Sequence, residues 1–600
     1  MRLHRSPSLL LLCILTVLQA STGLSSNCRC MPGDSCWPSS TDWARFNTSI
    51  GGRLVSTQPM GQPCHDPFYT ASECRSLRQQ WTKPELHDAS SSSIMAAAVA
   101  NETCDAFSPR SKPCKLGEMV RYAVNASSTD DFIQTIRFSQ ERNIRLVIRN
   151  TGHDYLGKST GAGALSIWTH YLKNIDFLNY TSSHYTGPAV RMTAGVQGAD
   201  IYEAAHRRGL VIVGGECATV GPVGGYTQGG GHSALSSRFG LGADQVLEWE
   251  VVDGMGQLLT ASPTQNPDLY WALSGGGGGT YGVVYAMTVK AFPDFPVTGV
   301  VLQFENSNPS SPHFFEAVGH YHRHLATYTT AGGMAIAQIT HSSFLLTPLT
   351  LPAHTAVEAK KLLAPFLQDL HKLNISYALN ITQSPSYFQH YIKLIEPNPT
   401  QLVQNGQYGG RLLPLNLIQH NNSQLTDAVQ RITADGVTFV GIGLNVSSSV
   451  TGNIWNSVLP AWRTAAMSVI LSTYAIFPRV AFIYFVSVCS LTQILQKLAH
   501  RCQPHRDENP SKPNDDQMGP DSDSLESRFG VLYERGKDKT QADPQEPDWK
   551  QTFYGRNYDL LYAIKRKYDP FRTFYAPTAV GSEDWQVKAG GRLCQVTKTD

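Results

Sequence analysis

Apolar and polar positions alternate along the middle of the chain in a way that predicts both helices and strands. Apolar residues recur at helical spacing over 130–142, after a Ser-Ser-Thr-Asp stretch that can cap a helix. The apolar run Ile144 to Ile148 then has the length of a strand. The theme repeats with a strand over 192–196, a helix over 200–208 and a strand over 210–213, so we expect an α+β or α/β lobe.

Three glycine-dense segments interrupt this pattern, at 149–157, at 214–231 and at 275–279, before a strand over 283–289. Flexible linkers are one interpretation of glycine runs. These segments are flanked by apolar elements, which favours a second interpretation, in which glycine lets main-chain amides approach a flat or phosphorylated ligand closely.

The first of these segments is a polar turn directly after the strand Ile144 to Ile148. Such a turn presents several backbone N–H groups at once, an arrangement that suits the pyrophosphate of a dinucleotide. His153 lies inside the turn, where it is either a hydrogen-bonded loop histidine or a group within bonding distance of a ligand ring.

The N-terminal part of the chain predicts export. Residues 1–23 combine a basic start, a short apolar run and small residues, as in a secretory signal peptide, and the run is too short to span a bilayer. Residues 24–115 form a loop-rich, cysteine-rich extension that we expect to be held by disulfides, Cys104 with Cys114 among the plausible pairs. N-glycan acceptor sequons support the same compartment; they lie at Asn47, Asn101, Asn125, Asn179, Asn374, Asn380, Asn421 and Asn445.

Length and charge narrow the function. The 600 residues exceed what one core usually supports, so we expect two or more lobes. The formal net charge of +2, without basic runs in the well-patterned regions, argues against nucleic acid as a partner and favours a small-molecule substrate. No metal site is predicted.

Residues 466–545 do not fit the pattern of the rest. The apolar stretch 467–491 contains Pro478 and Arg479, which makes a membrane span doubtful, and 501–526 has the composition of a disordered segment. An authentic insertion and a translated intron are both compatible with this region, which also contains Cys489 and Cys502.

Two strings carry a family resemblance: RNTGHDYLGKSTGAGALSIWTH from residue 149, and QTFYGRNYDLLYAIKRKYDPFRTFYAPTAVGSEDW from residue 551. They resemble the vanillyl-alcohol-oxidase-type FAD enzymes, in the branch that holds berberine bridge enzyme and fungal isoamyl-alcohol-oxidase-like and chanoclavine-synthase-like proteins. The resemblance implies an α+β, two-lobe PCMH-type FAD-binding fold. It implies an FAD-binding domain over 116–295, a separate α+β substrate domain over 296–545, and a C-terminal segment over 546–590 that packs on the FAD domain.

The resemblance also implies how FAD is held. His153 matches the histidine that binds the flavin 8α-methyl group, and Cys217, in the GxCxxVG context of 215–221, matches a cysteine that bonds flavin carbon 6. Ala218 stands where that context usually has proline, and a buried hydrophobe or a disulfide partner is the alternative for Cys217. The other cofactor-binding positions implied are Arg149, Asn150, Thr151, Gly152, Asp154, Leu156, Ser159, Gly215, Thr219, Gly221, Gly224, Gly225, Gly229, Gly230, Gly231, Asp244 and Asn557.

The implied reaction is hydride transfer from substrate carbon to flavin, with a base accepting the second proton. Tyr155 is the candidate base, supported by Tyr558, and packing of the rings is the alternative role for these tyrosines. We therefore expect a secreted FAD-linked oxidase that acts on an alcohol, an amine or a related C–H donor of secondary metabolism, with O2 as acceptor. A carbohydrate oxidase with the same flavin apparatus, and a secreted glycoprotein with a vestigial flavin site, are the alternatives.

Overall fold

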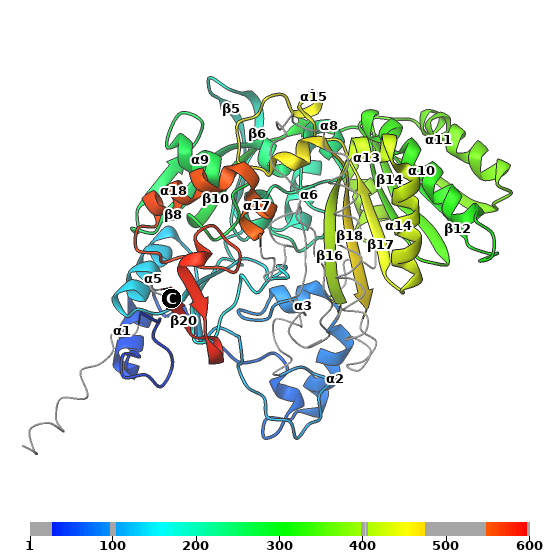
Figure 1. The fold of residues 1–600 in the computed structure, drawn as a ribbon. Helices are drawn as coiled ribbons and strands as arrows, with labels where there is room; N and C mark the ends of the chain where they lie inside the picture. Colours follow the sequence, from blue (N-terminus) through cyan, green and yellow to red (C-terminus); the bar gives the residue numbers. More distant parts are fainter. Residues whose placement is uncertain (1–26, 96–103, 398–402, 404–405, 475–547, 597–600) are drawn as a thin grey trace, which may run out of the picture.

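The computed structural model describes residues 27–95, 104–397, 403, 406–474 and 548–596. Figure 1 shows two lobes side by side: a first lobe, of residues up to 295 together with the C-terminal segment, and a second lobe, of residues 296–474. The mixed α+β class expected from the sequence is confirmed. The expected signal peptide, the sequon at Asn101, and Cys489 and Cys502 lie outside the described residues.

A small sheet at the base of the first lobe has the order β1-β2-β4-β3, with β2, β4 and β3 parallel and β1 antiparallel to β2. The predicted helix is α5 (Thr129–Glu141), which buries Phe132, Ile136 and Phe138 before the predicted strand, β3. The Ser128 side chain makes no capping bond, and Asp131 accepts the Ser127 N–H instead. The strands are β1 (Leu54–Ser56), β2 (Tyr122–Asn125), β3 (Leu146–Arg149) and β4 (Leu165–Trp168).

A five-stranded antiparallel sheet completes the first lobe, in the order β5-β6-β10-β8-β9. The predicted strand over 192–196 lies earlier, in β6, and the helix predicted over 200–208 is α6. The longer elements are β5 (Ile175–Thr181), β6 (Thr186–Thr193), α6 (Gly198–His206), β8 (Val246–Asp253), β9 (Leu258–Ala261), α9 (Pro267–Leu273) and β10 (Gly282–Lys290). The short ones are β7 (Leu210–Val211), η2 (Pro222–Tyr226), α7 (Thr227–Gly229), α8 (Ser236–Phe239), η3 (Gly242–Gln245) and β11 (Phe292–Pro293).

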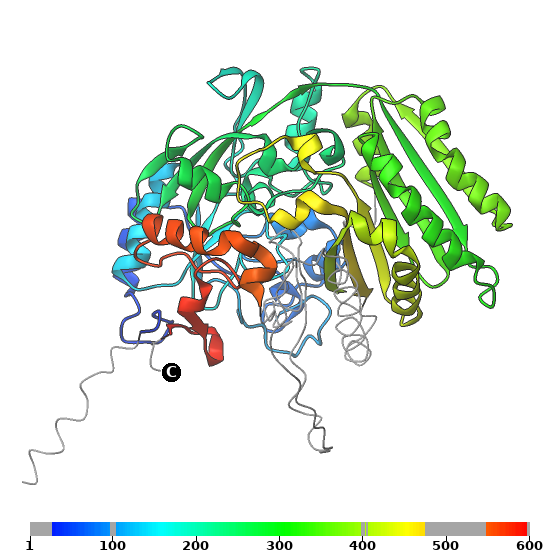
Figure 2. The same ribbon diagram turned by 45° about the horizontal axis from the view of Figure 1, so that its top comes forward.

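The second lobe is a seven-stranded antiparallel sheet, in the order β15-β12-β14-β13-β17-β18-β16, with helices on its outer face (Figure 2). Its strands are β12 (Val297–Glu305), β13 (Met334–Ile339), β14 (Ser343–Pro352), β15 (Tyr377–Ser384), β16 (Gly406–Pro414), β17 (Thr438–Gly443) and β18 (Ala465–Tyr474). The helices on that face are α10 (His313–Thr330), α11 (Ala356–Lys372), α13 (Leu415–His420) and α14 (Asn422–Ala434). The shorter helices lie against the first lobe instead: α12 (Tyr387–His390), η4 (Tyr391–Ile395), α15 (Ser448–Thr451) and η6 (Pro460–Thr464).

Alternation along the central strands divides this sheet between two cores. Ala335, Ala337 and Phe439 belong to the core under the helices, whereas Ile336 and Ile442 belong to the core shared with the first lobe. Successive side chains of a strand point to opposite faces, so an apolar strand can serve both cores. The inner face of the sheet therefore presents aliphatic side chains to the first lobe.

The region expected to be atypical, 466–545, begins within a strand of the second lobe. Residues 466–474 belong to β18, which pairs with β17 on one side and β16 on the other. Val469 and Leu471 are fully buried, because a strand between two neighbours in a covered sheet needs apolar side chains on both faces. The part of the atypical region that remains, 475–547, lies outside the described residues.

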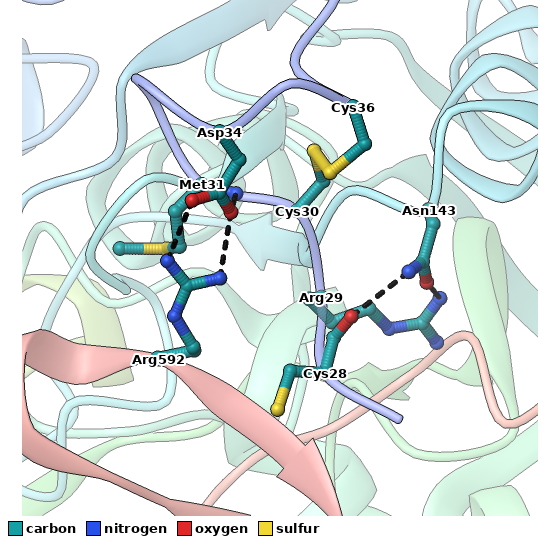
Figure 3. Close-up of a disulfide and its surroundings, with 8 residues drawn as sticks. All are labelled: Cys28, Arg29, Cys30, Met31, Asp34, Cys36, Asn143 and Arg592. Atoms are coloured by element: carbon teal, nitrogen blue, oxygen red, sulfur yellow. Dashed lines mark hydrogen bonds and ion pairs between the residues drawn. A yellow bond between two sulfur atoms is a disulfide. The ribbon is translucent and has the colours of Figure 1, made fainter. Parts of the chain in front are cut away.

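The cysteine-rich extension is held by four disulfides: Cys28–Cys594, Cys30–Cys36, Cys64–Cys74 and Cys104–Cys114, the last being the pair expected. Cys28–Cys594 joins the two ends of the described chain. Figure 3 shows Asp34 facing Arg592 beside the Cys30–Cys36 bond, with Nη1 and Oδ2 2.6 Å apart. The helices of the extension are α1 (Ser40–Ser49), η1 (Gln62–Cys64), α2 (Ala71–Gln80) and α3 (Pro84–Asp88).

The C-terminal segment lies against the first lobe in both views (Figures 1 and 2). Lys565 of this segment lies with Nζ 3.0 Å from Asp569 Oδ2 in a buried ion pair within the segment, and the same Nζ donates to the carbonyl oxygens of Phe574 and of Thr280, the latter in the first lobe. Its elements are α17 (Trp549–Tyr554), η7 (Gly555–Asn557), α18 (Tyr558–Tyr568), η8 (Ser582–Asp584), β19 (Trp585–Val587), η9 (Ala589–Gly591) and β20 (Leu593–Gln595). Among the described residues, no helix combines the length and apolar character that crossing a bilayer requires.

Replacing Lys565 with Met tests the weight of this ion pair. The variant leaves the Asp569 carboxylate buried without its cation, so we expect the free energy of unfolding to fall by about 3–5 kcal/mol in chemical denaturation. Lys567→Met, in the same helix, is the matched control, because Lys567 pairs with Asp268 at the surface with 59% of its side chain exposed. A loss above about 1 kcal/mol in the control, or equal losses in both variants, contradicts the assignment.

Candidate active site

A cavity of about 290 Å³ lies where the glycine-rich turns of the first lobe face the sheet of the second. Its first-lobe wall includes residues 150–155, 215–217, 224–226 and 278–279. Its second-lobe wall consists of Ile336, Tyr408, Val440, Ile442, Ile470 and Ser472. Concave, largely apolar sites with a few convergent polar groups are typical of small-molecule binding.

The turn after β3 places His153 in this cavity. Gly152 has φ +85°, and a Cβ there would lie 2.7 Å from Arg149 Nη1, so both backbone conformation and space require glycine. Asp154 organises the far side of the turn by accepting the N–H groups of Lys158, at 2.6 Å, and Ser159, at 3.3 Å. Those two amides are therefore already occupied by a side chain rather than directed at a ligand phosphate.

The ring of His153 is oriented by the second glycine-rich turn. Its Nε2 lies 2.7 Å from Thr219 Oγ1. Burial, with the nearby Arg149 and His87 charges, lowers the pKa of His153 to about 4. The imidazole is consequently neutral near pH 7, the form in which a ring nitrogen has a lone pair to donate.

The glycine turns pack closely on one another and on the side chain of Asn150. A Cβ on Gly221 would overlap Asn150 Oδ1, one on Gly224 would lie 2.6 Å from it, and one on Gly278 would lie 2.9 Å from the Cα of Gly225. Asn150 Nδ2 in turn donates to Thr169 Oγ1, at 3.0 Å, and to the Ala194 carbonyl. The turns from three parts of the chain thus form one continuous surface.

Cys217 lies in this surface and lines the cavity. It is the one cysteine outside a disulfide among the described residues, so the alternative of a disulfide partner is not realised there. Burial, followed by the neighbouring Glu216 charge, raises the pKa of the thiol to about 12, and the thiol is neutral near pH 7.

Glu216 and His232 also line the cavity, with Glu216 Oε1 4.0 Å from His232 Nδ1. Burial raises the pKa of Glu216 to about 7. The backbone around Glu216 is fixed from outside the turn: Tyr202 donates to the Gly215 carbonyl, and Tyr391 donates to the Glu216 carbonyl at 3.0 Å. The Glu216 carboxylate, with a pKa of about 7, is therefore carried beside Cys217 by a backbone that two hydrogen bonds fix.

The opposite wall combines aliphatic side chains with an aromatic pair. Tyr155, two residues after His153, packs on Tyr408 of β16, with ring centroids 4.8 Å apart and planes tilted by 34°. This contact joins the His153 turn of the first lobe to the edge strand of the second.

The structure brings most predicted residues to the cavity and leaves others outside it. Those that line it are Asn150, Thr151, Gly152, His153, Asp154, Tyr155, Ser159, Gly215, Cys217, Gly221, Gly224 and Gly225. Arg149 and Thr219 lie outside the lining but contact the His153 turn: the Arg149 guanidinium packs against Gly152, and Thr219 Oγ1 is hydrogen-bonded to His153. The remaining predicted residues outside the lining are Leu156, Gly229, Gly230, Gly231, Asp244, Asn557 and Tyr558.

Three of these outlying residues have structural partners. Asp244 pairs with Arg463 of the second lobe, with Oδ1 2.7 Å from Nη2. Asn557 donates to the Ser457 carbonyl at 3.2 Å, and the Tyr558 hydroxyl donates to both carboxylate oxygens of Glu583, at 2.5 and 2.6 Å. They connect the lobes and the C-terminal segment and lie outside the cavity lining.

Several lining residues were not predicted. Glu216 directly precedes the predicted Cys217, and an acidic residue inside a glycine-rich turn is a signal that could have identified it as a site residue. The second-lobe residues have no comparable signal, because isolated apolar residues on separate strands look like any core. Those missed are Leu146, Ile148, Lys158, Glu216, Val220, Tyr226, Gln228, His232, Gly278, Gly279, Ile336, Tyr408, Val440, Ile442, Ile470, Ser472, Phe574, Tyr575 and Ala576.

The donor set fits a flavin. The side-chain-free surface of Gly224, Gly225 and Gly278 gives a flat ring close backbone approach. A neutral histidine and a neutral thiol face the same space from different turns, as two attachment points on one ring would require.

Comparison with known proteins agrees with this interpretation. Residues 120–262 match the family described as FAD binding domain, and residues 541–581 match that described as berberine and berberine like. The FAD-linked oxidoreductase patO of Penicillium expansum is 77% identical over 598 residues, with all of both chains covered. The VAO-type flavoprotein oxidase VAO615 of Thermothelomyces thermophilus is 37% identical over 602 residues, which cover 98% of this chain and 99% of that protein.

The crystal structure of the VAO-type flavoprotein MtVAO615 from Myceliophthora thermophila superposes with a TM-score of 0.83 at 35% identity, covering 95% of this chain and all of that one. A chitooligosaccharide oxidase, 15% identical with a TM-score of 0.57, covers 77% of this chain and 92% of its own, and shares the fold. The chain therefore belongs to the FAD-linked oxidoreductases of the vanillyl-alcohol-oxidase and berberine-bridge-enzyme family.

Proposed function

We propose that this oxidoreductase is a secreted oxidase that removes a hydride from a small, mainly apolar alcohol, amine or related C–H donor of secondary metabolism and passes the electrons to O2. The observation that carries the proposal is that His153, Cys217 and the aliphatic wall of the second lobe line one cavity. FAD bound there supplies the acceptor for two electrons and a hydrogen nucleus.

His153 and Cys217 are the proposed attachment points for FAD. Because Nε2 of His153 is engaged with Thr219, Nδ1 is the ring nitrogen left for a covalent bond. The low pKa of His153 keeps the imidazole neutral, so one of its two ring nitrogens has a free lone pair. Cys217 faces the same cavity from the second turn, which supports a second bond.

The second-lobe wall supports an apolar substrate over a carbohydrate. Ile336, Val440 and Ile442 are buried aliphatic residues that offer no hydrogen bond to sugar hydroxyls. Burying several hydroxyl groups against such a wall without partners is unfavourable. Tyr155 is the proposed residue that meets the substrate's reacting hydroxyl or amine group.

Secretion is supported by the disulfides, which form and persist in oxidising compartments. The sequon asparagines Asn179, Asn374 and Asn380 are exposed, which makes them the best-placed glycan acceptors. The intact histidine, cysteine and glycine surface gives no support to a vestigial site.

Denaturing gels test the covalent attachment. We expect the wild-type band to fluoresce under ultraviolet light after denaturation, and His153→Ala and Cys217→Ala each to keep fluorescence through the remaining bond. The double variant should lose it. A wild-type band without fluorescence from yellow protein, or a fluorescent double variant, contradicts the proposal.

Peroxide release tests the reaction and the substrate class. We expect the purified yellow protein to release hydrogen peroxide with allylic or benzylic alcohols or the matching amines, and not with cello- or chitooligosaccharides. Benzyl alcohol and cinnamyl alcohol are suitable first probes. Peroxide from the oligosaccharides alone would replace the proposed substrate class with the carbohydrate alternative.

Tyr155→Phe tests the contact with the reacting group. We expect the anaerobic rate of flavin reduction by benzyl alcohol to fall by about 10²-fold, because one hydrogen-bonding group at the reacting oxygen is lost. The apparent Kd should change less than about threefold, since the ring stays in place. Tyr558→Phe is the matched control, because it removes a hydroxyl that binds Glu583, and it should leave the rate unchanged. Equal rates in wild type and Tyr155→Phe would reject the proposed role of Tyr155.

A further inference from the structure

We propose that Glu216 is the group that accepts the substrate's hydroxyl or amine proton, with His232 stabilising its charged form. This inference rests on the proposed function, because it identifies the base for the same oxidation. It gives the reaction a proton acceptor in the first lobe, on the turn that also holds Cys217.

The first argument is position. Glu216 lines the cavity, and 19% of its side-chain surface is exposed there. Within the described residues, its Oε1 atom is buried and has no hydrogen-bond partner. Buried carboxylate oxygens are normally satisfied, so an unpartnered one at the wall of a ligand cavity indicates a partner that arrives with the ligand.

The second argument is electrostatic. His232 Nδ1 lies 4.0 Å from Oε1 and is the cation-forming group beside the carboxylate. The other titratable groups around Glu216 are the Cys217 thiol and three phenols, those of Tyr202, Tyr387 and Tyr391. Burial raises the pKa values of that thiol and those phenols, so they are neutral near pH 7, whereas the pKa of about 7 makes Glu216 a group whose charge changes in that range.

The third argument is rigidity. Tyr202 from α6 and Tyr391 from η4 hold the carbonyl groups of Gly215 and Glu216. The His232 carbonyl accepts from the Tyr226 hydroxyl at 2.6 Å, and the His232 ring lies over Trp462, with centroids 6.4 Å apart. A base held this way needs little reorganisation when the proton moves.

The chemistry balances for an alcohol. The carbon–hydrogen bond breaks, and its hydrogen leaves with both electrons to the bound FAD, which is the oxidant. The oxygen–hydrogen bond breaks, its electron pair becomes the second carbon–oxygen bond, and the proton goes to the Glu216 carboxylate. Glu216 must therefore be ionised before the step, and its pKa of about 7 gives this carboxylate a proton affinity suited to neutral pH.

The sign of the pH dependence follows from this role. Flavin reduction should speed up as pH rises through about 7, because the carboxylate is the active form. In Glu216→Gln we expect the rate with benzyl alcohol to fall by about 10²–10⁴-fold and the rise near pH 7 to disappear. Glu203→Gln, which removes an exposed carboxylate of α6 paired with Arg207, is the matched control and should keep both rate and profile.

Infrared difference spectroscopy of the FAD-loaded protein between pH 5 and pH 9 tests Glu216 without a substrate. We expect a protonated-carboxyl band that titrates near pH 7, absent in Glu216→Gln and retained in Tyr155→Phe and Glu203→Gln. If no alcohol or amine reduces the flavin of the wild-type protein, the proposed function is overturned, while this band still reports on the ionisation of Glu216. If the wild-type flavin is reduced, but Glu216→Gln has unchanged kinetics or the protonated-carboxyl band is absent, the role of Glu216 alone is overturned.

Discussion

Direct contact between glycine turns is the constraint on which the rest of the site depends. Asn150 directly follows β3 and lies under Gly221 and Gly224, where a single Cβ would collide with its side chain. This contact brings Thr219 within 2.7 Å of His153 and puts Cys217 on the same surface. Because these turns pack closely on one another and on the Asn150 side chain, the positions of His153 and Cys217 tolerate little displacement.

The two lobes contribute different chemistry to one space. The first lobe supplies polar and ionisable groups on turns, and the second supplies aliphatic side chains from the inner face of its sheet. The buried Asp244 carboxylate, paired with Arg463, joins the lobes close to this junction. Breaking such a pair leaves a buried charge, so the pair specifies how the lobes meet.

Much of the first lobe could be predicted from the sequence, because its signals are local. The α5–β3 unit, the glycine segments and the Cys104–Cys114 loop all depend on neighbouring residues. The Cys28–Cys594 bond and the Tyr155–Tyr408 contact could not be predicted, since each joins residues far apart in the chain. Tyr558 stands in a recognisable motif, but the bond of its hydroxyl to Glu583, outside the cavity lining, has no signal in the sequence. The strand β18 was obscured by its place at the start of an atypical stretch.

The central claim is that one flavin ring is bonded to the surface these turns form. Mass spectrometry of peptides from the denatured, yellow wild-type protein tests it most directly. The account predicts that the peptide containing His153 carries the mass of FAD and that the peptide containing Cys217 is cross-linked to it through the same flavin. An unmodified His153 peptide from protein that was yellow before denaturation would contradict the account.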